Sequence, residues 1–557
     1  MAKTDNQKIE AKTSSIGQML SSKQFFRIPE YQRPFSWDKE QFDDLIDDLI
    51  AADKEQEYFF GTMVLHFVEN SGDHDVVDGQ QRLTSLMILL ACLRDLTDDP
   101  EFRSSLQDKI LQKRNKADGI PEKVRLRVRD WQRFGEIVVQ EGGTAAEHSI
   151  DGLSSQELRY LQAVASFREK LNGIPPKDLE QMIEFVSQKC VVVYFSSSSF
   201  DDAFRLFSIV NDRGKQLRRI DILKAANIAP GIITTDSSRS ALASQWESLE
   251  KELGESTFES IFHLLRLILL KDKPQADLLK EFEKRVFGKV KVDGSFLGKG
   301  ERFFSLAFKY AELYKRIFID RDIIPEKSPE SLKYKALIHI MDAEFAASEW
   351  RACLLAYASR FDNKGFYKFC LAIEKVYLQQ WVQSVRKDER FSEYAKVLSL
   401  IELAKAPMSV TSGVNYDPAP IKAAVGSSNF YNLGFSKYLL LRLELLASEH
   451  DCLKQFDAKS VEHVLPVGPD KTGYWADHHD LTRIKEYVDS IGNLVLLSKS
   501  KNSSASNYAF ERKKEKYLKT KVSDYPRSIQ VLKYKDWDRP AIEQRTKEAQ
   551  QLILDDI

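Results

Sequence analysis

Two different rhythms of apolar and polar residues divide this chain. In the first 200 residues the apolar positions form short continuous runs, at 58–68, 76–77 and 190–195, rich in β-branched and aromatic residues. Runs of this length bounded by turn residues predict buried strands. Farther along, apolar residues recur at helical spacing, and we expect long amphipathic helices at residues 258–270, 305–317, 366–378 and 437–447. The pattern therefore predicts an α+β N-terminal part followed by a helical middle.

The N-terminal part also contains helical spacing. Residues 1–24 predict a polar lead-in with a first short helix, and residues 42–50 predict a helix that packs on the core. Asp38 and Gln41 form a plausible capping pair for that second helix. Its aspartates are interpreted as a solvated outer face rather than as metal ligands: Asp43, Asp44, Asp47 and Asp48.

The length of 557 residues is enough for two to four domains. We expect a multidomain α+β protein with a first domain over residues 1–225, a helical positioning domain over 226–455 and a last domain over 456–557. The last range predicts strand, loop, strand and then a helix from about residue 506 to 519.

The sequence from Asp78 to Arg82, which reads Asp-Gly-Gln-Gln-Arg, lies between the predicted strand at 76–77 and an apolar helix expected at about 84–96. Backbone N–H groups at a helix N-terminus favour an anion, and an arginine adds a planar fork for phosphate. Asp78 could hold Mg²⁺ or a proton, and Gln80 and Gln81 could contact a base, a sugar or a water molecule. The alternative is a tight turn with an aspartate cap and a surface arginine.

Two further segments carry candidate polar side chains. Pro29 and Pro34 hold their segment extended, which is expected to display the residues between them in a rigid loop: Tyr31, Gln32 and Arg33. Arg213 precedes a glycine that ends a predicted helix, so it could reach a phosphate from a loop or satisfy the last helix carbonyls.

Residues 123–129 alternate between cations and apolar residues, which predicts a strand with one basic face. The cations expected to point outward are Lys123, Arg125, Arg127 and Arg129. They could track a phosphate backbone, or they could form a charged sheet edge that blocks aggregation. Both interpretations remain open at this point.

Composition narrows the class of protein. Apolar residues make up 43%, charged residues 30%, and the net charge is −1, so nucleic-acid binding would have to use local basic patches. No apolar run is long enough to cross a membrane and the N-terminus lacks a signal peptide, so we expect a cytoplasmic protein. The five cysteines are widely spaced and are expected to be buried rather than to bind zinc or form disulfides.

The last hundred residues contain a second group of candidate residues. Glu462 and His463 end a predicted strand, Asn493 follows 30 residues after His463, and Asn502 follows nine residues later. Carboxylate and amide oxygens suit Mg²⁺ or Mn²⁺. A neutral imidazole can take a proton from water near neutral pH. A basic segment that includes Lys513 follows.

The N-terminal blocks, read in order, resemble the DUF262 family, which has a ParB/sulfiredoxin-like core. The resemblance implies that Asp78, Gln80, Gln81 and Arg82 form a nucleotide-hydrolysis motif and that Gly79 belongs to its turn. It also implies that Tyr31, Gln32 and Arg33 face the same pocket, where they could bind nucleotide or read a DNA modification. Thr84 and Arg213 are further candidates for nucleotide binding.

The C-terminal block, with its E-H-x-x-P, G-N-L-x-L-L and S-x-x-x-N pieces, resembles the HNH nucleases with a ββα-metal core, and within them the DUF1524 family. This resemblance implies that His463 is the general base and that Glu462 and Asn502 are metal ligands. Asn493 would fix the loop that carries His463, and Lys513 would contact phosphate.

The fusion of the two blocks resembles the modification-dependent restriction proteins of the GmrSD type and their relative SspE. It implies an endonuclease of anti-phage defence that uses Mg²⁺ or Mn²⁺ and a nucleoside triphosphate (GTP, UTP, CTP or ATP). The expected partner is double-stranded DNA carrying phosphorothioate or glucosylated hydroxymethylcytosine, with a homo-oligomer allowed. The alternatives are a ParB-like nucleotide-switched DNA-binding protein with an inactive nuclease domain, and an RNA-cleaving toxin.

Overall fold

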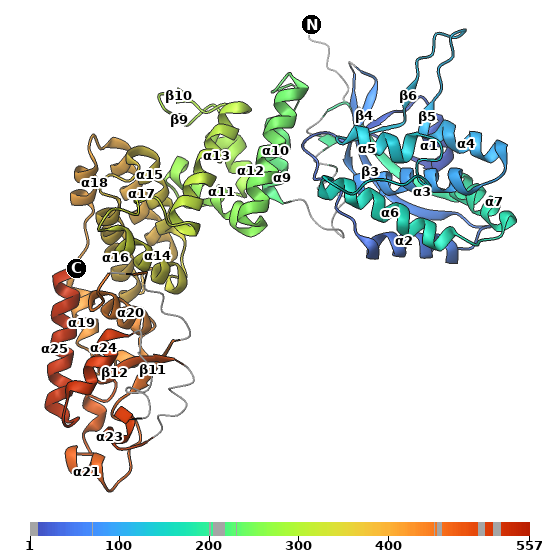
Figure 1. Ribbon diagram of the computed structural model, residues 1–557. Helices are drawn as coiled ribbons and strands as arrows, with labels where there is room; N and C mark the ends of the chain where they lie inside the picture. The colour runs from blue at the N-terminus through green and yellow to red at the C-terminus, as the bar shows by residue number, and fades with distance from the viewer. Residues whose placement is uncertain are drawn as a thin grey trace. The chain divides into compact units, whose positions relative to one another are not determined.

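The computed structural model describes residues 9–69, 71–199, 202–203, 206, 218–229, 231–450, 452–453, 459–498, 507–515 and 525–556. The chain forms two compact units, residues 1–244 and 245–557 (Figure 1). The helical middle and the C-terminal elements thus belong to one unit. No helix in the described ranges is long and apolar enough to cross a membrane.

A six-stranded sheet organises the first unit, in the order β1-β8-β3-β4-β2-β7. Its strands are β1 (Glu10–Ser15), β2 (Phe26–Arg27), β3 (Tyr58–Val68), β4 (Asp73–Asp78), β7 (Leu126–Arg127) and β8 (Cys190–Ser197). The three strands expected from apolar runs are confirmed. Strand β1 was not expected, because its sequence is polar and it pairs only at the sheet edge with β8.

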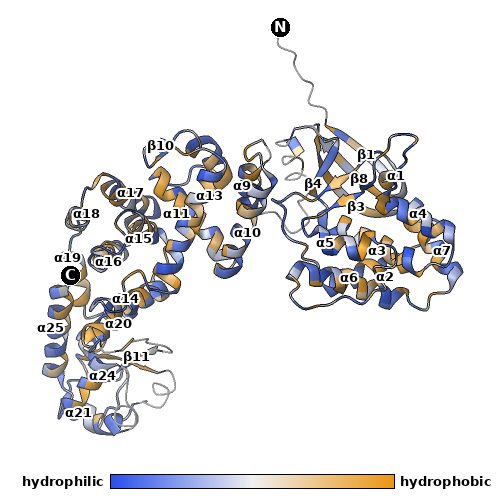
Figure 2. Cartoon of the chain, turned by 45° about the horizontal axis from the view of Figure 1, so that its top comes forward, coloured by the Kyte–Doolittle hydropathy of each residue, from blue (hydrophilic) through white to orange (hydrophobic). Residues whose placement is uncertain are grey.

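Helix α3 (Gln80–Leu96) lies at the centre of the unit and is buried on all sides from Leu83 to Arg94. Figure 2 shows hydrophobic residues gathered along it. The expected start at residue 84 is wrong, since Gly79 takes the N-cap position and the helix begins at Gln80. Gln80, Gln81 and Arg82 are therefore residues of the first helical turn rather than of a loop.

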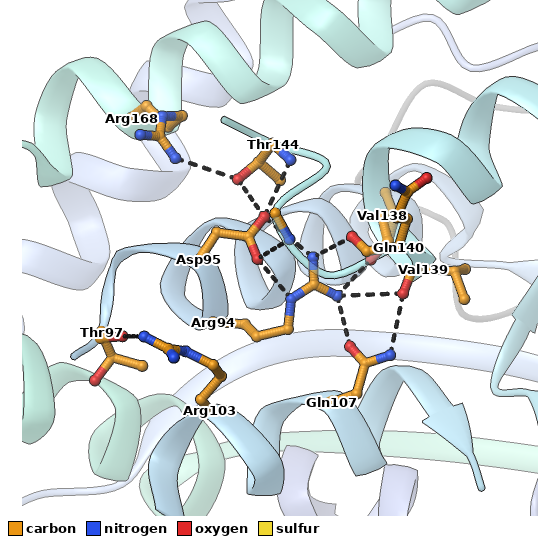
Figure 3. Close-up of polar contacts among 11 residues, drawn as sticks. Arg94, Asp95, Thr97, Arg103, Gln107, Val138, Val139, Gln140, Thr144 and Arg168 are labelled. Carbon is orange, nitrogen blue, oxygen red and sulfur yellow. Dashed lines mark hydrogen bonds and ion pairs between the residues drawn. The ribbon is translucent and has the colours of Figure 1, made fainter. Parts of the chain in front are cut away.

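The C-terminal end of α3 is fixed by a buried arginine (Figure 3). The guanidinium of Arg94 donates to the Gln107 side chain and to the backbone carbonyls of Val138 and Gln140, at 2.6 to 2.8 Å. The neighbouring Asp95 pairs with Arg94 and accepts from the backbone N–H and the hydroxyl of Thr144. A fully buried charge is tolerated only with such a complete set of partners.

The remaining helices of the first unit pack around the sheet and α3. They are α1 (Ile16–Ser21), α2 (Lys39–Ala51), α4 (Pro100–Ile110), α5 (Trp131–Phe134), α6 (Ser155–Leu171), α7 (Pro176–Glu184) and α9 (Arg219–Ile228). The capping box of Asp38 and Gln41 on α2 is confirmed. Asp44, Asp47 and Asp48 are exposed, as expected for an outer face.

The expected strand over residues 123–129 is broken into two short strands. β6 (Lys123–Val124) pairs with β5 (Leu111–Gln112) in a hairpin, and β7 joins the edge of the main sheet. The outward position expected for Arg125 is wrong, because this side chain is buried and donates to the Ser22 carbonyl at 2.6 Å. The kink between the two strands turns Arg125 inward, while Arg127 stays exposed.

Helix α10 (Asp236–Leu253) leads into the second unit, which is mainly helical. It contains α11 (Glu255–Leu270), α12 (Leu278–Glu281), α13 (Glu301–Tyr314), α14 (Ser331–Glu344), α15 (Glu349–Phe361), α16 (Phe366–Val382), α17 (Lys387–Leu403), α18 (Pro407–Gly413), α19 (Ala419–Val425) and α20 (Ser436–Leu446). A small hairpin, β9 (Lys291–Val292) and β10 (Ser295–Phe296), lies among them. The four helices expected from periodicity are confirmed.

The C-terminal elements of this unit are β11 (Lys459–His463), α21 (Tyr474–His478), β12 (Leu494–Ser498), α23 (Phe510–Lys513), α24 (Pro526–Ile529) and α25 (Arg539–Asp556). Glu444 of α20 is buried and accepts from the Ser528 hydroxyl and the Arg527 backbone N–H of α24. These contacts join α20 to the C-terminal elements.

Four of the five cysteines are buried, as expected: Cys92, Cys190, Cys353 and Cys370. Burial raises the pKa of Cys92 and of Cys190 to about 12, so these thiols are unreactive near neutral pH. Cys452 is the exception and is exposed.

Candidate active site

The C-terminal site is built on the antiparallel pair β11 and β12. Glu462 lies opposite Val495 and His463 lies opposite Leu494, at the end of β11. Glu462 and His463 are the last two residues of β11, and the chain continues directly into Val464 and Leu465. Those two apolar residues are fully buried, which anchors the strand end in the core of this region.

His463 is held by a carboxylate. Its Nε2 atom donates to Oδ1 of Asp489 at 2.8 Å, and 11% of its side chain is exposed. Since an ionised carboxylate can only accept, this contact fixes the proton on Nε2 and leaves Nδ1 as the basic nitrogen. The ring of Tyr431 packs against the imidazole at 4.4 Å between centroids, and the Tyr431 backbone N–H donates to the Asp489 carbonyl.

Asn493 is fully buried and fixes the loop after His463. Its amide donates to the carbonyls of Leu465 and Val488, at 3.0 and 2.7 Å, and its Oδ1 accepts from the Leu465 backbone N–H at 2.8 Å. The indole of Trp537 also donates to Oδ1, at 3.0 Å. These are the backbone contacts expected of Asn493. It is thus a positioning residue, with every amide hydrogen-bonding direction in use inside the protein.

Glu462 is paired with Lys513. The ammonium donates to Oε1 of Glu462 and to the His463 carbonyl, at 2.9 Å each, and 1% of the lysine side chain is exposed. Burial lowers the pKa of Lys513, while the Glu462 charge opposes that shift. The sequence predicted that Lys513 contacts phosphate. In the structure α23 points this side chain inward onto β11, where Glu462 and the His463 carbonyl bind its ammonium.

The carboxylate of Glu462 is an oxygen ligand of the type that a hard divalent cation prefers. The structure shows this carboxylate already holding a positive charge, the Lys513 ammonium, which also donates to the backbone carbonyl of His463. Within the described ranges no group of three His, Cys, Asp or Glu side chains could hold a metal ion. The second expected ligand, Asn502, lies outside the described residues. Coordination would have to be completed from there, from water or from a phosphate oxygen.

The N-terminal turn depends on two glycines. Gly79 has φ of 90°, and a Cβ added there would lie 2.8 Å from Cγ of Met63 on β3, so only glycine fits. A Cβ added to Gly61 would lie 2.7 Å from Nη1 of Arg82, so Gly61 leaves room for that exposed guanidinium. Burial raises the pKa of Asp78, although the Gly79 N–H and the Arg82 charge oppose the shift.

Two glutamines of the predicted nucleotide site form hydrogen bonds to the backbone. Gln32 is buried and donates to the carbonyls of Val76 and Val77 at the end of β4, at 3.0 and 2.7 Å. Gln81 accepts from the backbone N–H groups of Ser36 and Trp37 and donates to the Pro34 carbonyl. The prediction that a rigid loop displays Tyr31 and Gln32 is wrong, since both side chains are buried.

The first block and the turn nevertheless meet at a narrow pocket. Its polar lining residues are Arg33, Gln80, Gln81, Thr84, Arg129, Gln156 and Tyr160, and apolar side chains of the first unit complete it. It has room for little more than a water molecule, so a nucleotide would need the pocket to open. Asp78 and Arg82 are not among the residues that line it.

Arg33 is also tied to α9. Its guanidinium pairs with Asp221 at 3.1 Å, and Arg218 pairs with the other oxygen of the same carboxylate at 2.9 Å. Arg213, five residues before Arg218, lies outside the described residues.

Asp489 and Tyr431 were not found from the sequence. Asp489 precedes Asn493 by only four residues, but an aspartate in a polar loop carries no local signal that a histidine on another segment will contact it.

Comparison with protein-family models gives matches for three ranges of the chain. Residues 16–228 match the model of the GmrSD restriction endonuclease N-terminal domain, and residues 419–551 match that of the GmrSD restriction endonucleases C-terminal domain. Residues 294–418 match a family of unknown function, DUF7834. No curated protein matches the chain. The chain therefore matches, in order, both the N-terminal and the C-terminal domain models of the GmrSD restriction endonucleases, which is consistent with a protein of that type.

Proposed function

We propose that this protein is a metal-dependent, nucleotide-dependent endonuclease of phage defence that cuts modified double-stranded DNA at an HNH site centred on His463. The family assignment supports a DNA endonuclease in defence. One observation carries the catalytic proposal: Nε2 of His463 donates a hydrogen bond to Asp489, and His463 directly follows Glu462 at the end of β11. The order β11, β12, α23 supports a ββα-metal site.

His463 is the general base in this proposal. With Nε2 bound to Asp489, Nδ1 takes a proton from the attacking water, and the carboxylate stabilises the imidazolium that forms. Asn493 keeps the strand end fixed, so the imidazole needs no reorganisation. Glu462 and Asn502 would hold a Mg²⁺ or Mn²⁺ ion, which when bound would stabilise the negative charge of the phosphate and the leaving oxygen.

The N-terminal unit would bind and hydrolyse a nucleoside triphosphate at the turn before α3. The N-terminus of this 17-residue buried helix and the exposed Arg82 suit a phosphate chain. The raised pKa of Asp78 suits a group that exchanges a proton. The pocket lined by Arg33, Gln80 and Thr84 is the place where nucleotide or a DNA modification would be sensed, after it opens.

A second candidate is supported by the ion pair of Lys513 and Glu462. An ammonium bound to the expected metal ligand is also what an inactive nuclease domain would show, and the protein would then be a nucleotide-switched DNA-binding protein. The intact arrangement of His463, Asp489 and Asn493 favours the enzyme.

The proposal is tested by incubating the full chain with unmodified, phosphorothioated or glucosyl-hydroxymethylated plasmid, with Mg²⁺ or Mn²⁺, and with or without each nucleoside triphosphate. We expect cleavage that depends on the modification and the metal, and nucleotide turnover that is lost in Asp78→Ala. Nucleotide turnover without cleavage of any of the plasmids would support the switch instead.

A further inference from the structure

The hairpin of β5 and β6, residues 111–124, leaves the first unit as an arm (Figure 1). Its base is the antiparallel pairing of Leu111 with Val124 and of Gln112 with Lys123. A further bridge joins Asn115 to Ile120, with backbone hydrogen bonds of 2.9 Å in both directions. The arm is therefore a two-stranded ribbon that remains paired close to its tip.

The tip is a built turn. Oδ1 of Asn115 accepts from the backbone N–H groups of Ala117 and Asp118, at 3.0 and 3.3 Å, and its amide donates to the Asp118 carboxylate at 2.6 Å. Gly119 has φ of 67°, which closes the turn in a conformation that favours glycine. The shape of the arm is thus set before any partner binds.

The arm buries none of its own side chains beyond its base. Every residue from 113 to 122 is exposed, including Ile120 at 39%. A hairpin that contributes nothing to a core is hard to explain by folding. The segment 111–124 has four cations, at Lys113, Arg114, Lys116 and Lys123, against two carboxylates, at Asp118 and Glu122. Residues 113–122 hold three of these cations against both carboxylates, a net charge of +1, and Lys113 also pairs with Asp108 at the base of the arm, at 3.4 Å.

The base of the arm is rigidly attached. The buried Arg125 donates to the Ser22 carbonyl at 2.6 Å, its backbone N–H donates to the Ile110 carbonyl at 2.9 Å, and its guanidinium stacks on Phe25 at 4.9 Å. Lys123 pairs with Asp73 of β4. The chain then enters the edge strand β7, where Arg127 is exposed. The arm and this exposed cation therefore belong to one continuous stretch at the sheet edge.

We propose that this arm docks in a groove of the duplex DNA substrate, with Lys113, Arg114 and Lys116 on the phosphates and Arg127 on the backbone beside the groove. The major groove of B-form DNA admits a two-stranded β-ribbon, whereas the corresponding groove of double-stranded RNA is too narrow. A preformed, exposed and cationic ribbon matches that groove in shape and in charge. The inference rests on the proposed function only in taking DNA as the substrate.

The test measures binding of a fluorescent 30-base-pair DNA duplex to the full-length His463→Ala protein, which serves as the cleavage-deficient parent, over a series of salt concentrations. The test variant adds Lys113→Ala, Arg114→Ala and Lys116→Ala. The matched control instead adds Lys39→Ala, Lys170→Ala and Lys177→Ala, which removes three cations from α2, α6 and α7 of the same unit. An arm shortened to an Asn-Gly turn between Gln112 and Lys123 is the second variant.

We expect the triple arm variant to bind at least about tenfold more weakly at low salt and to lose about 2 to 3 from the slope of log K against log salt, since each phosphate contact contributes about 0.9. The shortened arm should behave in the same way, and the control should match the parent. Unchanged affinity and slope in both arm variants would overturn the arm proposal and leave the nuclease proposal intact. A parent that binds no DNA, or that binds the matching RNA duplex more tightly, would overturn both.

Discussion

Nε2 of His463 donates to Oδ1 of Asp489 across 2.8 Å, although 26 residues separate the two along the chain. Because this contact assigns the proton to Nε2, Asp489 determines which imidazole nitrogen can act as a base. The carboxylate is thus a positioning residue that directs the candidate general base toward water.

Replacing Asp489 by Asn should slow plasmid cleavage by about 10- to 100-fold, the range found for outer-shell partners of catalytic groups. The amide keeps the shape of the carboxylate but cannot stabilise an imidazolium. Affinity for DNA and the melting temperature should change little, because the side chain is partly exposed. The nearby exposed Asp477, changed to Asn, is the control. A rate equal to that of the Asp477→Asn variant would contradict the assigned role.

Replacing Asn493 by Ala should lower the free energy of unfolding much more than replacing His463 by Ala. Asn493→Ala removes a buried amide and leaves the Leu465 N–H and two carbonyls unpaired, so it should destabilise the second unit by about 2 to 4 kcal/mol and abolish cleavage. His463→Ala should abolish cleavage with a loss of stability below about 1 kcal/mol. Urea unfolding of both variants measures the difference, and equal destabilisation would argue against separate roles.

Lys513→Met should strengthen metal binding. The methionine fills a similar volume but no longer places an ammonium on Glu462, so an incoming cation has no charge to displace. We expect Mn²⁺ affinity, measured from free Mn²⁺ by electron paramagnetic resonance, to rise by about tenfold. Lys514→Met is the control, since Lys514 contacts the Tyr534 carbonyl and not Glu462. Equal Mn²⁺ affinity in the two variants would place the metal away from Glu462.

Replacing Gln81 should lower stability, whereas replacing Gln80 should lower nucleotide turnover. Gln81→Ala leaves the backbone N–H groups of Ser36 and Trp37 without their acceptor, so we expect a loss of about 1 to 3 kcal/mol of stability. Gln80→Ala should leave stability within about 0.5 kcal/mol and lower nucleotide turnover, because Gln80 lines the pocket at the helix N-terminus. Thermal unfolding and phosphate release measure both. A stable Gln81→Ala protein would contradict the tethering role.

Asp75 predicts a pH dependence of stability. Its side chain is buried, and each of its two carboxylate oxygens accepts a hydrogen bond from the Arg27 guanidinium, at 2.7 and 2.9 Å. Burial raises the pKa of Asp75, but the neighbouring His66, with Nδ1 3.9 Å away, and the hydrogen bonds from Arg27 outweigh it and lower the pKa below the ordinary carboxyl value. Its stabilisation is therefore present above the unfolded pKa and is lost as pH falls through the lower folded pKa.

Asp75→Asn should accordingly destabilise the first unit by about 3 kcal/mol near pH 7, since it leaves Arg27 without its charge partner. The difference from the parent should narrow as pH falls below about 4, where Asp75 of the unfolded parent chain begins to bind a proton while the folded state still holds it ionised. Urea unfolding at several pH values measures this difference. A difference that grows toward acid would contradict the assigned sign.

The sequence predicted the elements better than the orientations of their side chains. Strands such as β3 and β8 follow from local apolar runs, and Glu462, His463 and Asn493 follow from motif spacing. Whether a polar side chain faces solvent or the protein depends on packing between distant segments. Arg125 was expected to face solvent for this reason and is buried, and Lys513, expected to contact phosphate, is buried as well.

Gln32 and Gln81 show a related limit. An amide that could recognise a ligand can equally satisfy backbone groups, and the sequence does not distinguish these uses. In the structure Gln32 holds the end of β4 and Gln81 holds the segment that carries Arg33. Gln81 lines the same pocket as Gln80, so only its hydrogen bonds to the backbone in the folded structure distinguish the two glutamines.

The most direct test of the account is the initial rate at which the full chain converts supercoiled modified plasmid to nicked or linear DNA with Mn²⁺, compared with the His463→Ala variant at equal concentration. The account predicts that the variant loses at least about 100-fold in rate, as expected when a general base is removed, while its binding of the same plasmid is unchanged. Cleavage by the variant at the parental rate would contradict the assignment of His463 as the catalytic base.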